Sequence, residues 1–271
     1  MRSILKANGA YNKCLNQRYL CPMSKLAVSI VQFNITWKEK QTNFSRIEEM
    51  LHGIDAELIV LPELFQIGFC TDDMSLVETM EGPTVSWMCT YSKTHKNAIC
   101  GSFLCQDNDL VFNRFILVSE GEIVGHYDKT HLFGLGGEQE HISAGSNKVD
   151  MVVKGFKIRP LICYDLRFAY TSFNDTEYDI LLNVANWPSQ RIAHWDTLLQ
   201  ARAIENQVFV LGCNRVGEQD GHFYPGHSSV YAPEGLQVAH SVKEEVISIT
   251  LDKRQIEETR TKLPFLQDRR M

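Results

Sequence analysis

The sequence predicts an α/β fold in which mixed sheets are covered by helices. Short apolar runs such as 58–61 are typical of buried strands, and they alternate with segments whose apolar residues recur at helical spacing. Two turn signals, Glu120-Gly121 and Lys154-Gly155, predict hairpins, and hairpins need antiparallel strands. Because hairpins are mixed with the alternating elements, we expect mixed sheets rather than an all-parallel barrel. We find no linker and no internal repeat.

Each element follows from its own local pattern. The apolar residues of an expected helix share one face, as Phe44, Ile47, Leu51 and Ile54 do in the first one. The helices are expected at 43–54, 87–95, 194–206 and 253–262. The segments 110–126 and 149–162 are each expected to form a hairpin of two strands. Single strands are expected at 26–33, 58–61, 98–104, 179–184, 208–213, 228–232 and 246–251. The glycine-rich segment 134–145 is expected to be a loop.

Composition excludes two classes of partner. The chain has 271 residues, of which 44% are hydrophobic and 22% charged, enough for one large core. A formal net charge of −6 argues against nucleic acid, since no basic block offsets phosphate repulsion. No apolar run approaches the roughly 20 residues that a membrane-spanning helix needs. We therefore expect a cytoplasmic protein that binds neither nucleic acid nor membrane.

The eight cysteines fit a reduced, cytoplasmic protein. None of them forms a C-x-x-C pair, and a chain of this length does not need disulfides for stability. The nine histidines show no metal-ligand spacing against the cysteines, so we expect no metal site.

The N-terminal segment differs from the rest of the chain. Its first 25 residues carry five basic side chains and no acidic one, and the first acid is Glu39. We expect residues 1–22 to be an extension, disordered or outside the native start, ahead of one domain at 23–271. A transit peptide has a similar composition, but Pro22 interrupts an amphipathic helix, and we favour a true start at Met23.

The most informative site candidate is Cys163. An apolar run ends at this cysteine and polar residues follow at once, a pattern typical of a buried strand that ends in a sharp turn. A thiol on such a turn can attack a carbonyl carbon. The competing interpretation is a buried structural cysteine, the commoner role of a lone cysteine.

Two further charged residues follow expected strands. Glu63 comes directly after the run 58–61, where a poorly solvated carboxylate suits a general base. Lys129 ends the second strand of a hairpin, where an ammonium can stabilise an oxyanion and lower a thiol pKa. Taken alone, Glu63 could simply cap the loop after its strand, and Lys129 could simply be solvated. Together with Cys163 they supply the base, the cation and the nucleophile that acyl transfer from an amide requires, at an edge where α/β sheets gather ligand sites.

Three motifs in this order resemble the carbon–nitrogen hydrolase (nitrilase) superfamily and its Glu-Lys-Cys triad. They are LPELF at 61–65, YDKTHLF at 127–133 and LICYDLRF at 161–168. The resemblance runs from about Lys25 to the C-terminus. It implies a nitrilase-like α-β-β-α sandwich, with four layers completed in each domain and extended by dimerisation, so a homodimer is expected.

Further segments resemble the ω-amidase-like branch of that superfamily. They are NVANWP at 183–188, His194-Trp195, ARAIENQ at 201–207 and GCNRVG at 212–217. Members of this branch cleave the terminal amide of 2-oxoglutaramate or 2-oxosuccinamate and need no metal or organic cofactor. Alternatives are a nitrilase or N-carbamoyl hydrolase with the same triad, or an inactive scaffold of the same fold.

The resemblance also implies supporting roles around the triad. The backbone N–H of Tyr164 would share the oxyanion with Lys129. Glu138 would be the second glutamate that orients this lysine, with Glu140 as the alternative. Two further roles follow from the residues themselves: Trp187 follows a buried strand and could form a wall of the substrate pocket, and Arg191 could bind a substrate carboxylate, since guanidinium pairs bidentately with it. Each of these side chains has a purely structural or solvated alternative.

Remaining polar residues near the motifs have expected structural roles. Asp165 and Arg167 are spaced to order the turn after Cys163, and Arg202 and Glu205 to pair along a helix. A histidine could instead serve as the base of a Cys-His enzyme. The conceivable partners are His131, His194 and His227, but none lies in a recognised cysteine-protease context.

Overall fold

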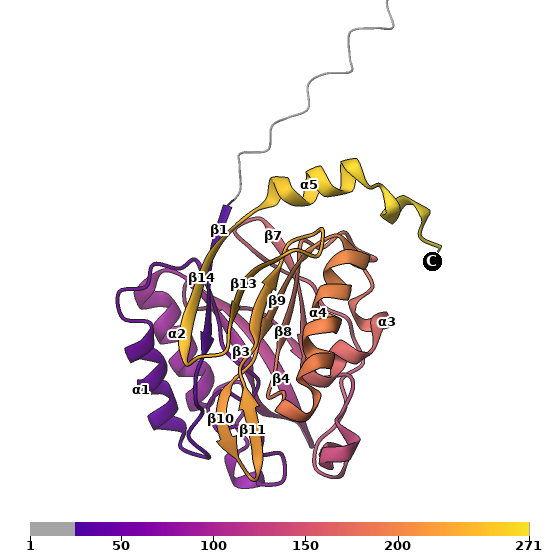
Figure 1. Cartoon of the computed structure of the whole chain (residues 1–271). Helices are drawn as coiled ribbons and strands as arrows, with labels where there is room; N and C mark the ends of the chain where they lie inside the picture. The colour runs from indigo at the N-terminus through magenta and orange to yellow at the C-terminus, as the bar shows by residue number, and fades with distance from the viewer. Residues whose placement is uncertain (1–24, 271) are drawn as a thin grey trace, which may run out of the picture.

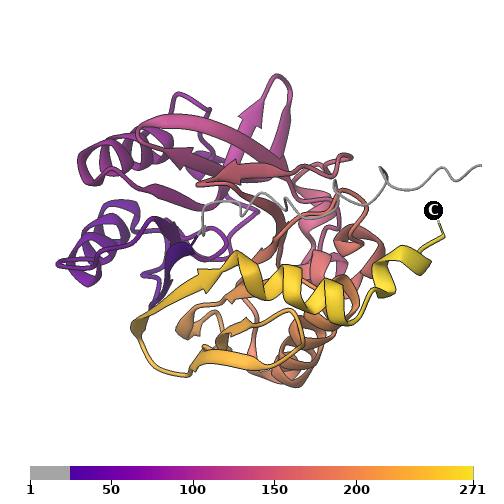
Figure 2. The ribbon, with the colours of Figure 1, turned by 90° about the horizontal axis from the view of Figure 1, so that it is seen from above.

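A computed structural model describes residues 25–270 and contains two six-stranded sheets packed face to face, with helices on their outer faces. Figure 1 shows α1 and α2 on one side of the sheets and α3 and α4 on the other, and Figure 2 shows the same layers from above. The predicted α/β class with mixed sheets, and the α-β-β-α sandwich that the resemblance implied, are thereby confirmed.

The first sheet has the order β14-β1-β2-β3-β4-β5. Its strands are β1 (Lys25–Gln32), β2 (Leu58–Val60), β3 (Ala98–Asp107), β4 (Leu110–Ser119), β5 (Glu122–Asp128) and β14 (Glu245–Asp252). β1, β2 and β3 are parallel to one another. β14 pairs antiparallel with β1, β4 with β3, and β5 with β4. The β4–β5 turn has positive φ at Glu120 and Gly121, the geometry of a tight two-residue hairpin.

The second sheet has the order β13-β12-β9-β8-β7-β6. Its strands are β6 (Met151–Val153), β7 (Phe156–Ile162), β8 (Ile180–Val184), β9 (Phe209–Cys213), β12 (Ser228–Tyr231) and β13 (Gln237–Ser241). β7, β8 and β9 are parallel, with antiparallel strands on either side. A separate hairpin pairs β10 (Val216–Gln219) with β11 (His222–Pro225) and projects from the end of the sheets opposite to α5 (Lys253–Lys262) in Figure 1.

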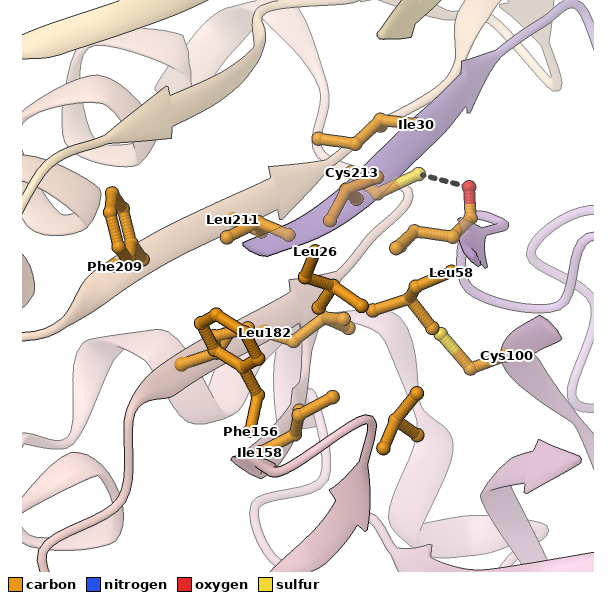
Figure 3. Packing of buried hydrophobic residues seen from close by; sticks show 14 of the residues in the cluster. Leu26, Ile30, Leu58, Cys100, Phe156, Ile158, Leu182, Phe209, Leu211 and Cys213 are labelled. Carbon is orange, nitrogen blue, oxygen red and sulfur yellow. Dashed lines mark hydrogen bonds between the residues drawn. The ribbon is translucent and has the colours of Figure 1, made fainter. Parts of the chain in front are cut away.

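The main core lies between the two sheets. Alternate strand residues point into it: Leu26 and Leu58 from the first sheet meet Phe156, Leu182 and Leu211 from the second, as Figure 3 shows. The intervening residues face the helices, because successive side chains of a strand point to opposite faces. The central strands of both sheets are therefore buried on both faces, which explains the wholly apolar runs in the sequence.

The helices close the outer faces. α1 (Lys40–Met50) and α2 (Pro83–His95) cover the first sheet, where Phe44, Ile47 and Met88 pack against its apolar residues. α4 (Ile192–Asn206), with the short α3 (Ala169–Ser172), covers the second sheet through Trp195 and Leu199. These are the buried faces that the helical spacing predicted, except that Ile54 lies beyond the end of α1 and is exposed.

Several elements differ from the sequence prediction. α1 ends before 54, α2 begins four residues earlier than expected with Pro83 at its start, and β3 continues to Asp107. The strands β10, β11 and β13 and the helix α3 were not predicted. The β10–β11 turn is Asp220-Gly221, with positive φ at both residues; this dipeptide is a strong hairpin signal.

Two expectations concern residues outside the described range. The nature of residues 1–22 and the choice between Met1 and Met23 fall there, as do Cys14 and Cys21. Six cysteines lie within 25–270, and all six are free thiols. Within the same range, none of the helices combines the length and the apolarity that crossing a membrane requires.

Candidate active site

Five strands bring their carboxyl ends to one edge of the sandwich. β5 runs antiparallel to β4, which runs antiparallel to β3, so β5 ends at the same edge as β2. Glu63 follows β2, Lys129 follows β5 and Cys163 follows β7. The segment that begins at Asn186 follows β8 at this edge, and β9 ends there as well. Loops from both sheets therefore converge there, as in other open α/β sheets.

Glu63 is fully buried and its carboxylate accepts hydrogen bonds from three residues. Oε1 accepts from Lys129 Nζ at 2.9 Å and from Asn113 Nδ2 at 2.9 Å. Oε2 accepts from the backbone N–H of Asn186 at 2.9 Å, and Asn186 Nδ2 donates to the Glu63 carbonyl at 2.6 Å. The carboxylate is thus held between the two sheets, because Asn113 comes from the first and Asn186 from the second.

Lys129 lies between two carboxylates. Its Nζ is 2.9 Å from Glu63 Oε1 and 2.8 Å from Glu138 Oε2, and its side chain is about 1% exposed. Burial alone would lower the pKa of Lys129, but the carboxylates of Glu138 and Glu63 outweigh it and raise the pKa. The lysine is therefore a fixed ammonium ion at neutral pH, and it cannot act as a base there.

Glu138 is the loop glutamate that reaches Lys129. It is fully buried, and its Oε2 also accepts the backbone N–H of Phe133 at 2.6 Å. Burial raises the pKa of Glu138, and the neighbouring Lys129 opposes that rise. Glu140, the alternative, is exposed. The predicted loop 134–145 contains two short 3-10 turns, and the second, Glu138–Glu140, begins with Glu138.

Cys163 sits on a sharp turn at the end of β7. Its φ is +46°, and it opens a 3-10 turn that extends to Arg167. A non-glycine residue with positive φ is uncommon, and such strain persists only where the surroundings hold it. The expected lowering of the thiol pKa by Lys129 does not prevail: burial and the nearby Glu63 carboxylate raise the pKa of Cys163 well above its ordinary value. The resting thiol is therefore protonated and needs a base.

Asp165 holds this turn in place. Its Oδ2 accepts the backbone N–H of Ile162 at 3.1 Å and the Tyr127 hydroxyl at 2.8 Å, and its Oδ1 accepts the backbone N–H of His131 at 2.8 Å. The supporting role expected for Asp165 agrees with these contacts. Arg167 does not share it: its guanidinium lies 4.8 Å from the Trp187 ring.

The three candidate histidines all have other neighbours. His131 Nδ1 lies 3.0 Å from Asp165, His194 Nδ1 lies 3.1 Å from Arg167, and His227 Nδ1 lies 3.0 Å from Asp196. Within residues 25–270 we see no Cys-His pair at Cys163. Arg202 and Glu205 form the expected helical pair at 3.0 Å.

A cavity of about 180 Å³ opens beside Cys163. Tyr164, Trp187 and Arg191 line it, as do Phe69, Phe133 and Tyr224. Trp187 is 2% exposed and donates its indole N–H to the Arg191 carbonyl at 2.8 Å, so it is both core and cavity wall. The small volume and the aromatic lining suit a small ligand.

Sequence reasoning assigned no role to Asn113, Asn186 or Tyr224, although all three belong to this region. Asn113 is a buried polar residue inside β4, but one amide in a strand gives no hint of its partner 50 residues away. Tyr224 lies on the unpredicted strand β11. The described residues contain no cluster of three or more histidine, cysteine or acidic side chains arranged to hold a metal ion.

Comparison with known proteins identifies similar chains. A family model described as carbon–nitrogen hydrolase matches residues 27–261. An omega-amidase of Escherichia coli is 38% identical over 250 residues, which cover 91% of this chain and 97% of that protein. A 2-oxoglutaramate amidase of Bacillus subtilis is 33% identical over 252 residues, covering 90% and 97%.

Solved structures show the same architecture. A carbon–nitrogen hydrolase superfamily protein of Xanthomonas campestris, described with an arsenic adduct in its active site, has a TM-score of 0.88 and 35% identity, with coverage of 92% and 98%. A member of branch 10 of the nitrilase superfamily from Saccharomyces cerevisiae has a TM-score of 0.83 and 28% identity, again covering 92% and 98%.

Proposed function

Because this chain belongs to the carbon–nitrogen hydrolase family, and is a hydrolase that acts on amide C–N bonds, we propose that it removes the terminal amide of a small 2-oxo acid amide. The candidate substrates are 2-oxoglutaramate and 2-oxosuccinamate, and the products are the 2-oxo acid and ammonia. The strongest support is the ammonium of Lys129 fixed 2.9 Å from Glu63, beside a cavity lined by Cys163. The relatives named omega-amidase and 2-oxoglutaramate amidase support the substrate class.

In the proposed first step the Cys163 sulfur attacks the amide carbon. Glu63 takes the thiol proton, which is needed because the raised pKa keeps the thiol protonated at rest. The C–O double bond becomes an oxyanion, held by the Lys129 ammonium and the backbone N–H of Tyr164. Each such donor is worth ~3 kcal/mol of barrier in measured oxyanion holes. The oxyanion collapses, the C–N bond breaks, and Glu63 delivers its proton to the leaving ammonia.

In the proposed second step water hydrolyses the thioester. Glu63 takes a proton from water, hydroxide adds to the thioester carbon, and the same donors hold the second oxyanion. Collapse expels the Cys163 thiolate, which recovers the proton from Glu63, and releases the acid. Glu138 keeps Lys129 aimed at the oxyanion, since the two groups are 2.8 Å apart in the buried network. No cofactor or metal is required by these steps.

We assign the substrate's carboxylate to Arg191. Its guanidinium lies 5.1 Å from the Phe133 ring and forms no ion pair with the acids of residues 25–270. A guanidinium that is free at a cavity wall can pair bidentately with a carboxylate. Trp187 forms the wall beside it.

Measuring ammonia release tests the amidase function against the two alternatives, a nitrilase and an N-carbamoyl hydrolase. Purified protein is expected to release ammonia from 2-oxoglutaramate with a kcat/KM well above that for a simple aliphatic nitrile or an N-carbamoyl amino acid. A preference for the nitrile would favour a nitrilase, and a preference for the N-carbamoyl compound would favour that hydrolase class. Absence of turnover with all three would contradict the amidase function.

We further propose that the enzyme is cytoplasmic, on the basis of its cysteine usage, and that it acts as a homodimer, as the family resemblance implies. Light scattering on purified protein is expected to give twice the mass of 31.0 kDa. A monomeric mass at working concentration would contradict the dimer while leaving the amidase assignment intact.

A further inference from the structure

Arg215 carries a buried charge that no acid of the described residues pairs with. It is fully buried, at the start of the β10–β11 hairpin, and its guanidinium donates only to neutral oxygens. These are the carbonyls of Val216 and Ile35 and the side-chain amides of Asn34 and Gln219. Burial lowers its pKa to about 10, so the group remains charged at neutral pH. An uncompensated buried charge is costly and needs an explanation.

Tyr224 lies against this guanidinium and also lines the cavity. The Arg215 guanidinium is 4.7 Å from the Tyr224 ring, a cation–π contact. Tyr224 is 4% exposed, and its hydroxyl forms no hydrogen bond with the described part of the chain. Burial raises the pKa of Tyr224 to about 12, so its hydroxyl stays a proton donor over the working pH range.

Positive charge therefore predominates around the cavity. Lys129 is balanced by the carboxylates of Glu63 and Glu138. Arg167 and Arg191 line the cavity and Arg215 lies behind Tyr224, and no acid of residues 25–270 pairs with any of these three guanidinium groups. An amide substrate that also carries a carboxylate matches this excess of positive charge.

On the basis of the amidase function proposed above, we propose that the Tyr224 hydroxyl donates a hydrogen bond to the substrate's carboxylate beside Arg191. Arg215 positions Tyr224 and adds the electrostatic field of an uncompensated positive charge. This assigns substrate selection to the β10–β11 hairpin: it favours amides that carry a distal carboxylate over neutral amides of the same length. Arg215 touches no substrate in this proposal and acts only through Tyr224 and through its charge.

A matched pair of substrates isolates this contact. 2-Oxoglutaramate and 4-oxopentanamide share the amide, the chain length between amide and ketone, and the ketone, but a methyl group replaces the carboxylate in the second. Loss of a hydrogen bond to a charged group corresponds to roughly a 10- to 100-fold change. Tyr224→Phe is expected to raise KM for 2-oxoglutaramate by that factor, with kcat little changed and kcat/KM for 4-oxopentanamide within about twofold.

Two further variants complete the test. Tyr91→Phe removes a hydroxyl from another buried tyrosine, on α2 at the outer face of the first sheet, and is expected to leave kcat and KM for both substrates unchanged. Arg215→Met is expected to raise KM for 2-oxoglutaramate and to weaken competitive inhibition by the product, 2-oxoglutarate. It is expected to leave kcat/KM for the neutral 4-oxopentanamide unchanged. Tyr224→Phe remains decisive if Arg215→Met fails to fold.

The outcomes separate this inference from the amidase function. If the unaltered enzyme hydrolyses 2-oxoglutaramate but Tyr224→Phe affects both amides equally, or neither, the role of Tyr224 is wrong and the amidase function stands. If the unaltered enzyme releases no ammonia from 2-oxoglutaramate, the proposed function itself fails.

Discussion

Two cysteines at the ends of strands of the second sheet have different surroundings: one lies at the cavity and the other lies in the core between the sheets. Cys213 ends β9 and Cys163 follows β7, with β8 between them. The Cys213 thiol points into the apolar core in Figure 3, where it contacts the backbone carbonyls of Val31 and Val60 at 3.7 and 3.6 Å. Cys163 instead lines the cavity beside Glu63 and Lys129.

Cys163 is only partly buried, whereas Cys213 is fully buried. Burial is nevertheless the leading cause of a raised pKa at both thiols, so neither is a thiolate at rest. The chemical difference lies in the neighbours. Among residues 25–270, Cys213 has carbonyl oxygens, apolar side chains and the thiol of Cys100 around it, whereas Cys163 has a carboxylate that can accept its proton and an ammonium that can stabilise the resulting charge.

The largest expected effect comes from Cys163→Ala. We expect kcat for ammonia release to fall by a factor on the order of 10⁴ or more, since nucleophile removal in comparable enzymes has effects of that size. The melting temperature should hardly change, because the side chain borders a cavity. Cys213→Ala is the matched control: it should keep its activity and lose about 1 kcal/mol of unfolding free energy to a small core void.

The contrast between these two variants can be overturned directly. A large fall in melting temperature for Cys163→Ala, together with retained turnover, would make Cys163 a structural cysteine like Cys213. Activity assays and thermal unfolding on the same preparations decide between the two roles.

The next effect concerns Lys129, whose charge holds the buried carboxylates together. Lys129→Met should abolish turnover and lower the free energy of unfolding by about 3–5 kcal/mol, because it leaves Glu63 and Glu138 buried without their cation. Adding Glu138→Gln should restore part of this stability, but not activity. Urea unfolding measures both variants, and equal stability of Lys129→Met and the unaltered protein would contradict the buried network.

The smallest expected effect is a shift in thiol reactivity with pH. The Glu63 carboxylate raises the pKa of Cys163 and Lys129 lowers it, so Glu63→Gln should lower this pKa and move the midpoint of iodoacetamide labelling to lower pH. Turnover should nevertheless be lost, since no group then carries the proton to ammonia. Peptide mass spectrometry follows each cysteine separately.

The labelling experiment contains its own controls. In the unaltered protein Cys163 should label before Cys100 and Cys213, which are fully buried. The profile of Cys213 should not respond to Glu63→Gln. If the Cys163 midpoint stays in place in that variant, Glu63 is too far from the sulfur to act as its base.

Much of the fold could be predicted because its signals are local. Glu120-Gly121 and Lys154-Gly155 both form the expected hairpin turns, and the face carrying Phe44 and Ile47 packs against the first sheet as its spacing indicated. The missed β10–β11 hairpin had its own signal, Asp220-Gly221, but short flanking strands without clear alternation gave it no support. Element ends were less predictable, since contacts with neighbouring elements decide where a helix or strand stops.

The order and chemistry of Glu63, Lys129 and Cys163 along the chain were determined by the sequence itself, because each directly follows a strand and carries a group suited to acyl transfer. Only the tertiary structure decided which loop glutamate meets Lys129, that Asn113 and Asn186 hold Glu63, and that Arg215 lies against Tyr224. Strand periodicity is a property of neighbouring residues, whereas these contacts join segments up to 123 residues apart and exist only once both sheets have packed.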